Sequence, residues 1–159
     1  GLRGSATELS ATGNREAARM MRRAGPEDEE ALRDLYRKAV AVAPWLPPDA
    51  RAGRDLRAES KSETQFVCCE AEGAILGFVS VYAADAFVHH LYVSPHHQRQ
   101  GVGTALLDSL DSWLPLPWRL KCVTANVDAM RFYAARGWTV ESRGSGSDGP
   151  YALLRKDAA

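Results

Sequence analysis

The chain has 159 residues, of which 45% are hydrophobic and 25% are charged, proportions typical of a globular protein. This length fits one domain and can bury a core that needs no disulfide or metal to be stable. Twenty basic and twenty acidic residues balance, which gives no overall attraction for nucleic acid or for an anionic membrane. No apolar run approaches the roughly 20 residues that span a bilayer, and the N-terminus has no hydrophobic signal-peptide core. We therefore expect a cytoplasmic protein that binds neither nucleic acid nor membrane.

The first part of the chain divides into a leader and the start of a domain. Residues 1–18 are rich in small and charged residues without an apolar period, so we expect a flexible leader outside a domain that spans residues 19–159. A short strand is expected around Met20, followed by a turn at Gly25-Pro26. Apolar residues at i, i+3, i+4 spacing then predict an amphipathic helix from Pro26 to about Ala43. Its acidic first turn complements the helix dipole.

Residues 45–63 are polar and give the weakest signals. One short helix over about residues 49–59 is expected here. Two interpretations of the segment remain open, because it could line a substrate site or simply connect two elements at the surface.

The rest of the chain alternates strand and helix signals. Strands are predicted at residues 65–70, 75–82, 87–93 and 119–124, and helices at residues 103–113 and 128–136. Two final strands, at residues 138–143 and 151–155, would flank a Gly/Ser-rich loop. The three cysteines, Cys68, Cys69 and Cys122, are odd in number and fall in strands, so they are expected to be buried thiols rather than disulfides.

The most informative segment is a glycine-containing loop between a strand and a helix. Gly101 and Gly103 let the backbone approach a ligand closely, and the free N–H groups of a helix N-terminus favour an anion. The P-loop pattern is absent, and the third glycine of the Rossmann fingerprint is missing. On the glycines alone, a tight connection without a ligand is as good an explanation as a phosphate site.

A resemblance to a known family decides between these explanations. The loop reads QRQGVG, which matches the pyrophosphate-loop pattern [RQ]-x-x-G-x-[GA], and residues 126–138 read NVDAMRFYAARGW, which matches N-x-x-A-x-x-F-Y-x-x-x-G-[FW]. Over about residues 20–156 the chain thus resembles the GNAT superfamily of N-acetyltransferases. The resemblance implies an α/β fold with a central mixed, mostly antiparallel sheet, helices on both faces, and strands that splay beside Val93 at the coenzyme A site.

The resemblance also implies acetyl-CoA as the acyl donor and assigns its contacts. Asn126 would bind the cofactor arm, although Asn is also a favoured helix N-cap and both roles can hold. Tyr133 would protonate the leaving thiolate, and the alternative is a core tyrosine packed on Phe132. The cofactor-binding residues implied are Leu91, Val93, Gln98, Arg99, Gln100, Gly101, Val102, Gly103, Thr104, Asn126 and Tyr133.

The acceptor amine must lose a proton before it attacks, and histidine is suited to that task. His89 takes the place of the strand histidine of arylalkylamine acetyltransferases, whereas Phe87 stands where other GNAT enzymes carry a catalytic glutamate. Because neighbouring strand residues face opposite sides, only one of His89 and His90 is expected to face the substrate. His89 is the first choice of base, His90 the second, and water or another residue such as Asp85 the third.

Two further expectations concern the other polar residues. His96 and His97 are expected to face solvent or the cofactor phosphates, and no metal site is expected because the four histidines lack a paired Cys or Glu spacing. Cys122 has no assignable partner, which disfavours an acyl-cysteine route.

The expected function is transfer of an acetyl or other acyl group from acetyl-CoA to a primary amine, by direct attack in a ternary complex. A small molecule or a peptide is the expected acceptor, and strand edges of this fold allow a homodimer. The alternative is a non-catalytic acyl-CoA-binding or sensing module of the same fold, because fold alone never decides function.

Overall fold

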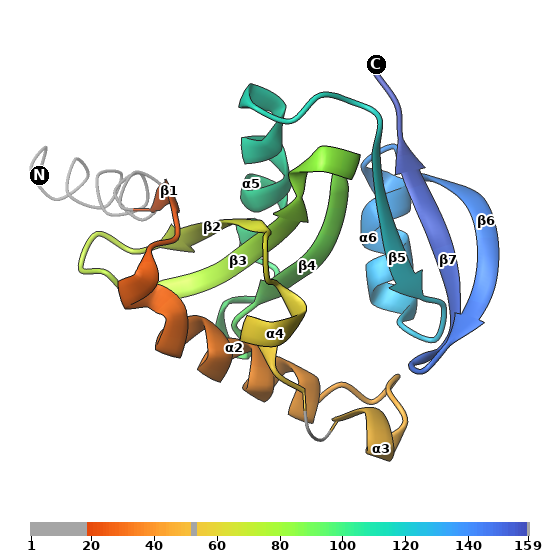
Figure 1. Ribbon diagram of the computed structural model, residues 1–159, viewed down its shortest axis with the longest axis horizontal. Helices are drawn as coiled ribbons and strands as arrows, with labels where there is room; N and C mark the ends of the chain where they lie inside the picture. The colour runs from red at the N-terminus through yellow and green to blue at the C-terminus, as the bar shows by residue number, and fades with distance from the viewer. Residues whose placement is uncertain (1–18, 52–53, 159) are drawn as a thin grey trace, which may run out of the picture.

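The computed structural model describes residues 19–51 and 54–158, which form a seven-stranded sheet in the order β1-β2-β3-β4-β5-β7-β6 (Figure 1). The expected leader, residues 1–18, lies outside the described residues. The strands are β1 (Met20–Arg23), β2 (Thr64–Cys69), β3 (Ile75–Tyr82), β4 (Phe87–Val93), β5 (Trp118–Val123), β6 (Thr139–Gly146) and β7 (Gly149–Lys156). The α-helices are α2 (Glu29–Ala41), α3 (Pro48–Arg51), α4 (Leu56–Glu59), α5 (Val102–Asp108) and α6 (Val127–Ala135).

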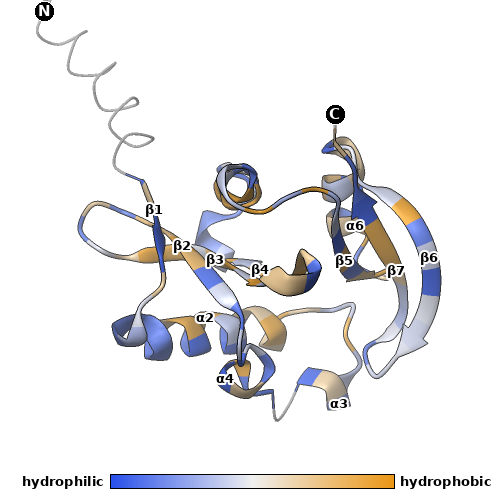
Figure 2. Cartoon of the chain, turned by 45° about the horizontal axis from the view of Figure 1, so that its top comes forward, coloured by the Kyte–Doolittle hydropathy of each residue, from blue (hydrophilic) through white to orange (hydrophobic). Residues whose placement is uncertain are grey.

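Helices cover both faces of the sheet. In Figures 1 and 2, α2, α3 and α4 lie on one face, and α5 and α6 lie on the other. A buried cluster under α2 contains Leu32, Leu35, Tyr36 and Phe78. A second cluster, under α5 and α6, contains Leu106, Leu107, Leu110, Trp118 and Trp138. Among the described helices, none is long and apolar enough to cross a membrane.

The sheet has two halves that meet at a single parallel contact. Every other pair of neighbouring strands is antiparallel, whereas β4 and β5 run parallel and are in register only at Phe87 and Arg119. Beyond that point the strands separate, as Figure 1 shows. The expectation of a mixed, mostly antiparallel sheet that splays toward Val93 is therefore confirmed.

Two predicted elements are wrong in detail. The single helix over residues 49–59 is interrupted at Arg54 and Asp55, because the Asp55 carboxylate accepts the Arg57 N–H at 3.2 Å and so caps a separate helix, α4. The predicted Gly/Ser-rich loop is mostly strand, since β6 and β7 pair as far as Gly146 and Gly149. Gly149 has a φ of 101°, which suits a tight hairpin turn.

A partly buried ion pair holds the start of the domain. Arg22 on β1 donates hydrogen bonds of 2.7 and 2.8 Å to the Asp28 carboxylate, which also accepts the Gly25 N–H at 2.8 Å. Asp28 is 5% exposed. The hydrogen bonds from Arg22 lower the pKa of Asp28 to about 2. This contact fixes the start of α2 beside the edge strand β1, away from the place where β4 and β5 separate.

The cysteines behave as expected from the sequence. Cys68, Cys69 and Cys122 are all free and buried. Burial raises the pKa of Cys122 to about 11, so its thiol stays protonated at neutral pH. A thiol in that state is a poor nucleophile, in agreement with the expectation that an acyl-cysteine route is disfavoured.

Candidate active site

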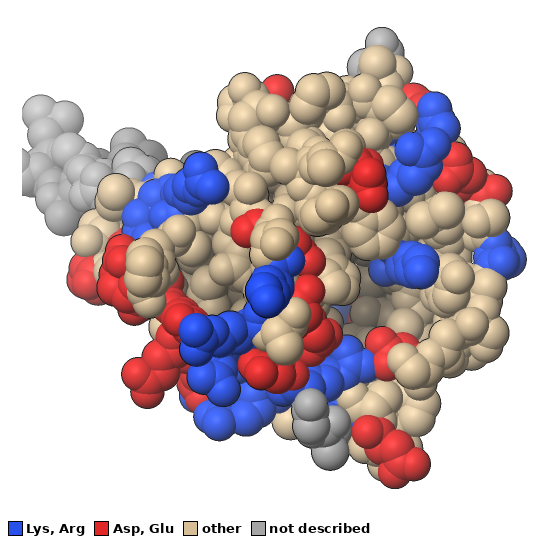
Figure 3. All heavy atoms as spheres, viewed as in Figure 1, with Lys and Arg blue, Asp and Glu red and all other residues tan. Residues whose placement is uncertain are grey.

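A cleft of about 980 Å³ opens where β4 and β5 separate. The face drawn in Figure 3 is hollowed between α4 and β5, beside the mixed Lys, Arg, Asp and Glu side chains over α2 and α4. Five of the expected site residues line this cleft: His89, His90, Leu91, Asn126 and Tyr133. The splay of the sheet thus brings the candidate base, the candidate acid and part of the expected cofactor path together.

Strand β4 carries an extra residue at His89. Ser80 of β3 pairs with His90, and the next residue, Val81, pairs with Val88, so His89 has no partner of its own. Such a β-bulge interrupts the alternation of side chains along a strand. The rings of His89 and His90 accordingly lie 4.0 Å apart, centroid to centroid, on the same side. The expectation that only one of the two histidines faces the cleft is wrong, because it assumed a regular strand.

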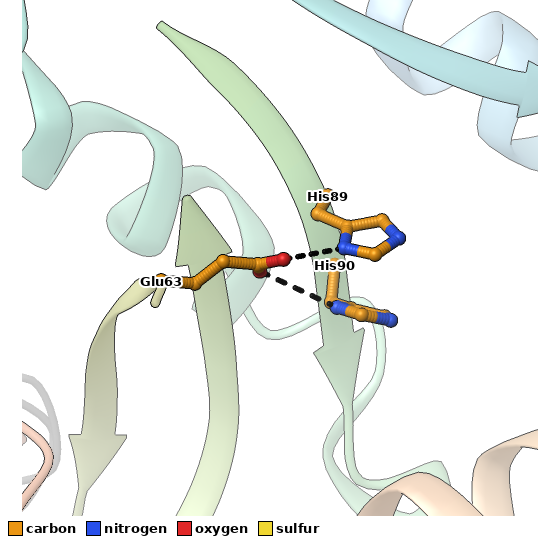
Figure 4. Close-up of side chains that lie close together, drawn as sticks. All are labelled: Glu63, His89 and His90. Atoms are coloured by element: carbon orange, nitrogen blue, oxygen red, sulfur yellow. Dashed lines mark hydrogen bonds and ion pairs between the residues drawn. The ribbon is translucent and has the colours of Figure 1, made fainter. Parts of the chain in front are cut away.

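Glu63 orients His89. The two side chains share a hydrogen bond of 2.6 Å from Nδ1 to Oε2, which Figure 4 shows. The other carboxylate oxygen of Glu63 accepts the Ser80 hydroxyl at 2.6 Å. The Glu63 side chain is 6% exposed, whereas that of His89 is 39% exposed. A buried carboxylate that accepts the Nδ1 proton leaves the lone pair of Nε2 on the more exposed part of the ring.

His90 differs sharply from its neighbour. It is 4% exposed, and its Nδ1 has no hydrogen-bond partner among the described residues. Its ring packs edge-on against Tyr36, with centroids 5.2 Å apart. Burial, together with the charges of His89 and Arg54, lowers the pKa of His90 to about 3. A neutral imidazole with so low a pKa is a weak base, which favours His89 for proton removal.

Tyr133 comes from α6 on the opposite wall. It is 8% exposed, and its ring packs edge-on against Phe132 and Trp138, with centroids 5.2 and 5.6 Å away. Burial raises the pKa of Tyr133 well above its ordinary value, so the hydroxyl remains protonated at neutral pH. Tyr133 is therefore a core residue that also lines the cleft with a protonated hydroxyl, so its burial in the core does not exclude the predicted role as an acid.

Asn126 also combines two roles. Its Oδ1 accepts the Ala129 N–H at 3.2 Å, so it caps the N-terminus of α6. It lines the cleft at the same time, and within the described part of the chain its amide nitrogen donates no hydrogen bond.

The glycine loop, defined as Gln98–Thr104, lies beyond the end of β4 and runs into α5. Arg99 and Gly101 have φ values of 62° and 80°, and Gly101 immediately precedes the helix. The N–H groups of Arg99, Gln100 and Gly101 donate to no other described residue. A Cβ on Gly103 would lie 3.3 Å from Phe132 Cζ and 3.7 Å from Val93 Cγ2. The loop is thus packed against the end of β4 and against α6, and within the described part of the chain its backbone donors have no partner.

Arg136 at the end of α6 supports this loop. Its guanidinium donates two hydrogen bonds, of 2.6 and 3.0 Å, to the Thr104 hydroxyl and stacks 3.7 Å from the Phe132 ring centroid. Arg136 was not predicted to be a functional residue, because it occupies a variable position of the second motif. The histidines before the loop also differ from each other: His96 is exposed, whereas His97 is half-buried, with Nε2 4.0 Å from Glu70.

A family comparison agrees with this geometry. The model of the acetyltransferase (GNAT) family matches residues 29–138. The chain belongs to this family. No sequence among curated proteins matches it significantly.

Solved GNAT structures share the fold at low sequence identity. Apo YjaB from Escherichia coli is 21% identical, with a TM-score of 0.72 over 89% of this chain and 99% of that one. The putative acetyltransferase yncA from Salmonella typhimurium, solved with its cofactor acetyl-CoA, is 21% identical, with a TM-score of 0.69 over 88% and 94% of the two chains. Phosphinothricin acetyltransferase from Sinorhizobium meliloti, solved in complex with acetyl-CoA, is 18% identical, with a TM-score of 0.65 over 89% of each chain.

Beside α4, the cleft contains a polar network that was not predicted from the sequence. Glu59 on α4 accepts the Tyr36 hydroxyl at 2.9 Å, and that hydroxyl also accepts a hydrogen bond of 3.2 Å from Arg54. Arg54 in turn pairs with Asp148 at the β6–β7 turn. The network ties the segment before α4 to the far half of the sheet, across the mouth of the cleft. The described part of the polar segment, residues 45–51 and 54–63, therefore contributes to the lining of the cleft and does not only connect two elements.

Proposed function

We propose that this chain is an N-acetyltransferase that transfers the acetyl group of acetyl-CoA to a primary amine of a small molecule or a peptide. The observation that carries the proposal is the bulge of β4, which exposes a carboxylate-oriented histidine in the same cleft as a buried tyrosine hydroxyl. A module that only bound acyl-CoA would need the phosphate site but neither of these groups.

The cofactor end would rely on backbone groups. The free N–H groups of the glycine loop would bind the pyrophosphate, with the Gln98 and Arg99 side chains at its edge. Backbone groups of Leu91 and Val93, on the strand edge that β5 leaves free, would pair with the pantetheine arm as an added strand does. Asn126 would bind the same arm through its amide. Bound in this way, acetyl-CoA would supply the activated acetyl group.

At the acceptor end, His89 would remove a proton from the ammonium, directly or through a water, and so give the amine the lone pair it needs to attack. Glu63 would hold the imidazole in the tautomer whose Nε2 accepts that proton, and would stabilise the charge that forms on the ring. Proximity of the two bound substrates would supply much of the rate enhancement.

Tyr133 would act last. As the carbon–sulfur bond breaks, the electron pair goes to sulfur, and the Tyr133 hydroxyl would donate its proton to the thiolate. The high pKa of this buried phenol keeps the proton in place until then.

The test is release of free thiol from acetyl-CoA in the presence of a panel of primary amines, with the His89→Gln variant beside the wild type. We expect turnover with at least one amine, and a fall of about 100-fold in the variant, because that is the contribution of a general base. The loss should lessen as the pH approaches the pKa of the acceptor's own ammonium, since the amine then needs no base. Saturable binding of acetyl-CoA without turnover on any amine would favour the binding module instead.

A further inference from the structure

Glu63, His89 and His90 bring three potential metal ligands together. Each offers one carboxylate or imidazole atom, and these atoms lie within 4.8 Å of one another. Figure 4 shows the two rings on one side of β4, with Glu63 reaching toward both. The spacing of the histidines along the chain predicted no metal site, but Glu63 comes from a distant segment and the bulge brings the two histidines to one side.

His90 supplies a second, independent observation. It is 4% exposed, and its buried Nδ1 has no hydrogen-bond partner among the described residues. That atom lies 3.8 Å from Glu63 Oε1, too far for a hydrogen bond. A buried polar atom without a partner lowers stability, and such atoms often indicate an ion or water at the site. An ion bound to Glu63 would satisfy this nitrogen.

We propose that Glu63, His89 Nδ1 and His90 Nδ1 form a binding site for a divalent transition-metal ion of the zinc type. Two imidazole nitrogens and one carboxylate oxygen suit Zn²⁺, whereas Mg²⁺ and Ca²⁺ prefer oxygen ligands alone. Tetrahedral zinc with ligand distances of about 2.0–2.1 Å places its ligand atoms roughly 3.3 Å apart. At present Glu63 Oε2 lies 2.6 Å from His89 Nδ1 and Glu63 Oε1 lies 3.8 Å from His90 Nδ1, so the two oxygens of the carboxylate bracket that value.

Ser80 and Glu59 are placed to orient two of the three proposed ligands. The Ser80 hydroxyl donates to the Glu63 carboxylate at 2.6 Å, and Glu59 Oε1 lies 3.7 Å from His90 Nε2. Metal-bound histidines commonly direct their second nitrogen toward a carboxylate.

Metal binding would switch off the proposed proton transfer, a consequence that rests on the proposed function. An ion on His89 Nδ1 takes the place of the proton shared with Glu63, and the ring then carries its proton on Nε2. That nitrogen no longer has a lone pair for the acceptor ammonium. Zinc binding and general-base catalysis by His89 therefore exclude each other.

Equilibrium dialysis of the full chain with Zn²⁺, without an affinity tag and without acetyl-CoA, tests the site directly. We expect one zinc ion per chain, and affinity weakened by about tenfold or more in His89→Gln and in His90→Gln, since even outer partners of a metal contribute 10- to 100-fold. Co²⁺ in place of Zn²⁺ should give the visible absorption of a tetrahedral complex. The matched control is a His96→Gln/His97→Gln variant, which removes the other adjacent histidine pair and should bind as the wild type does.

Three outcomes would overturn the proposal: no saturable binding to the wild type, equal affinity in His89→Gln, or loss of binding in the control, which would locate the ion at His97 and Glu70. His89 is well exposed, so its variant decides the matter even if His90→Gln fails to fold. Because the measurement needs no turnover, absence of acetyl transfer would refute the proposed function and leave the metal site standing. With active enzyme, zinc should inhibit turnover, and a chelator should restore it.

Discussion

The bulge of β4 and the glycine loop are close in sequence, because the bulge lies near the start of β4 and the loop follows the end of that strand. The two regions are nevertheless built from different groups. The loop presents backbone N–H groups without partners among the described residues, and Gly101 adopts a conformation that few residues tolerate. The bulge presents side chains that are hydrogen-bonded to one another: Glu63 accepts the Ser80 hydroxyl and shares a hydrogen bond with His89.

This difference predicts how each region responds to substitution. A site made of backbone groups that binds an anion tolerates loss of side chains but not an added negative charge. A site made of side chains loses its chemistry when single atoms are removed, while the packing around it persists. Variants in the two regions should therefore separate cofactor affinity from turnover.

The largest effect is expected from Tyr133→Phe at the side-chain end. The substitution removes only the hydroxyl and keeps the ring contacts with Phe132 and Trp138. We expect turnover to fall by about 10²- to 10⁴-fold, the range for a lost general acid. Affinity for coenzyme A should change by no more than about twofold. Steady-state kinetics and calorimetric titration measure the two quantities, and unchanged turnover would remove Tyr133 from the mechanism.

An intermediate effect is expected from Gly101→Glu at the backbone end. The added carboxylate would face the pyrophosphate, and repulsion of roughly 2 kcal/mol, typical of like charges near a protein surface, corresponds to about 30-fold weaker binding of coenzyme A. Gly101→Asn is the control, because Asn tolerates the φ of 80° without adding charge. Equal affinity in wild type and Gly101→Glu, measured by calorimetry, would refute the loop as the phosphate site.

The smallest effect on the reaction is expected from Asp28→Asn, far from both regions. Turnover and affinity at neutral pH should stay unchanged, while the free energy of unfolding falls by about 1–2 kcal/mol, since Arg22 is partly screened by solvent. The folded-state pKa of Asp28 is lowered, so its stabilisation is present above the ordinary pKa of 3.8 and is lost as the pH falls toward about 2.

Urea denaturation over that pH range should show the difference in unfolding free energy between wild type and Asp28→Asn shrinking as the pH falls. A constant difference would mean that the ion pair with Arg22 is not its source. Reduced turnover in this variant would instead show that general stability, rather than the cleft, governs activity.

Much of the architecture was predictable because it depends on local patterns. Strands β1, β3 and β4 and helix α2 follow from apolar periodicity and turn residues, and two motifs indicated the glycine loop, Asn126 and Tyr133. The bulge was not predictable, because it arises from the register between β3 and β4, and nothing in the chain around His89 encodes an extra residue. Glu63 was missed for the same reason, since it meets His89 only through that register.

The polar segment before β2 gave the poorest prediction. One of its two short helices, α4, begins at the Asp55 cap, and the contacts of the segment depend on partners far along the chain, such as Asp148 for Arg54. Hydrophobic periodicity carries no information about such pairings. A long-range ion pair becomes visible only when both halves of the sheet are in place.

Because His89 has no partner on β3, β4 could lose this residue without changing how its neighbours pair with β3. Val88 and His90 face consecutive residues of β3, so deleting His89 alone would leave a regular ladder with both flanking registers unchanged. Deletion of this single residue would therefore change a strand that directs two histidines toward Glu63 into a strand that directs one. Insertions and deletions at this point could add or remove a titratable group from the cleft without rebuilding the sheet.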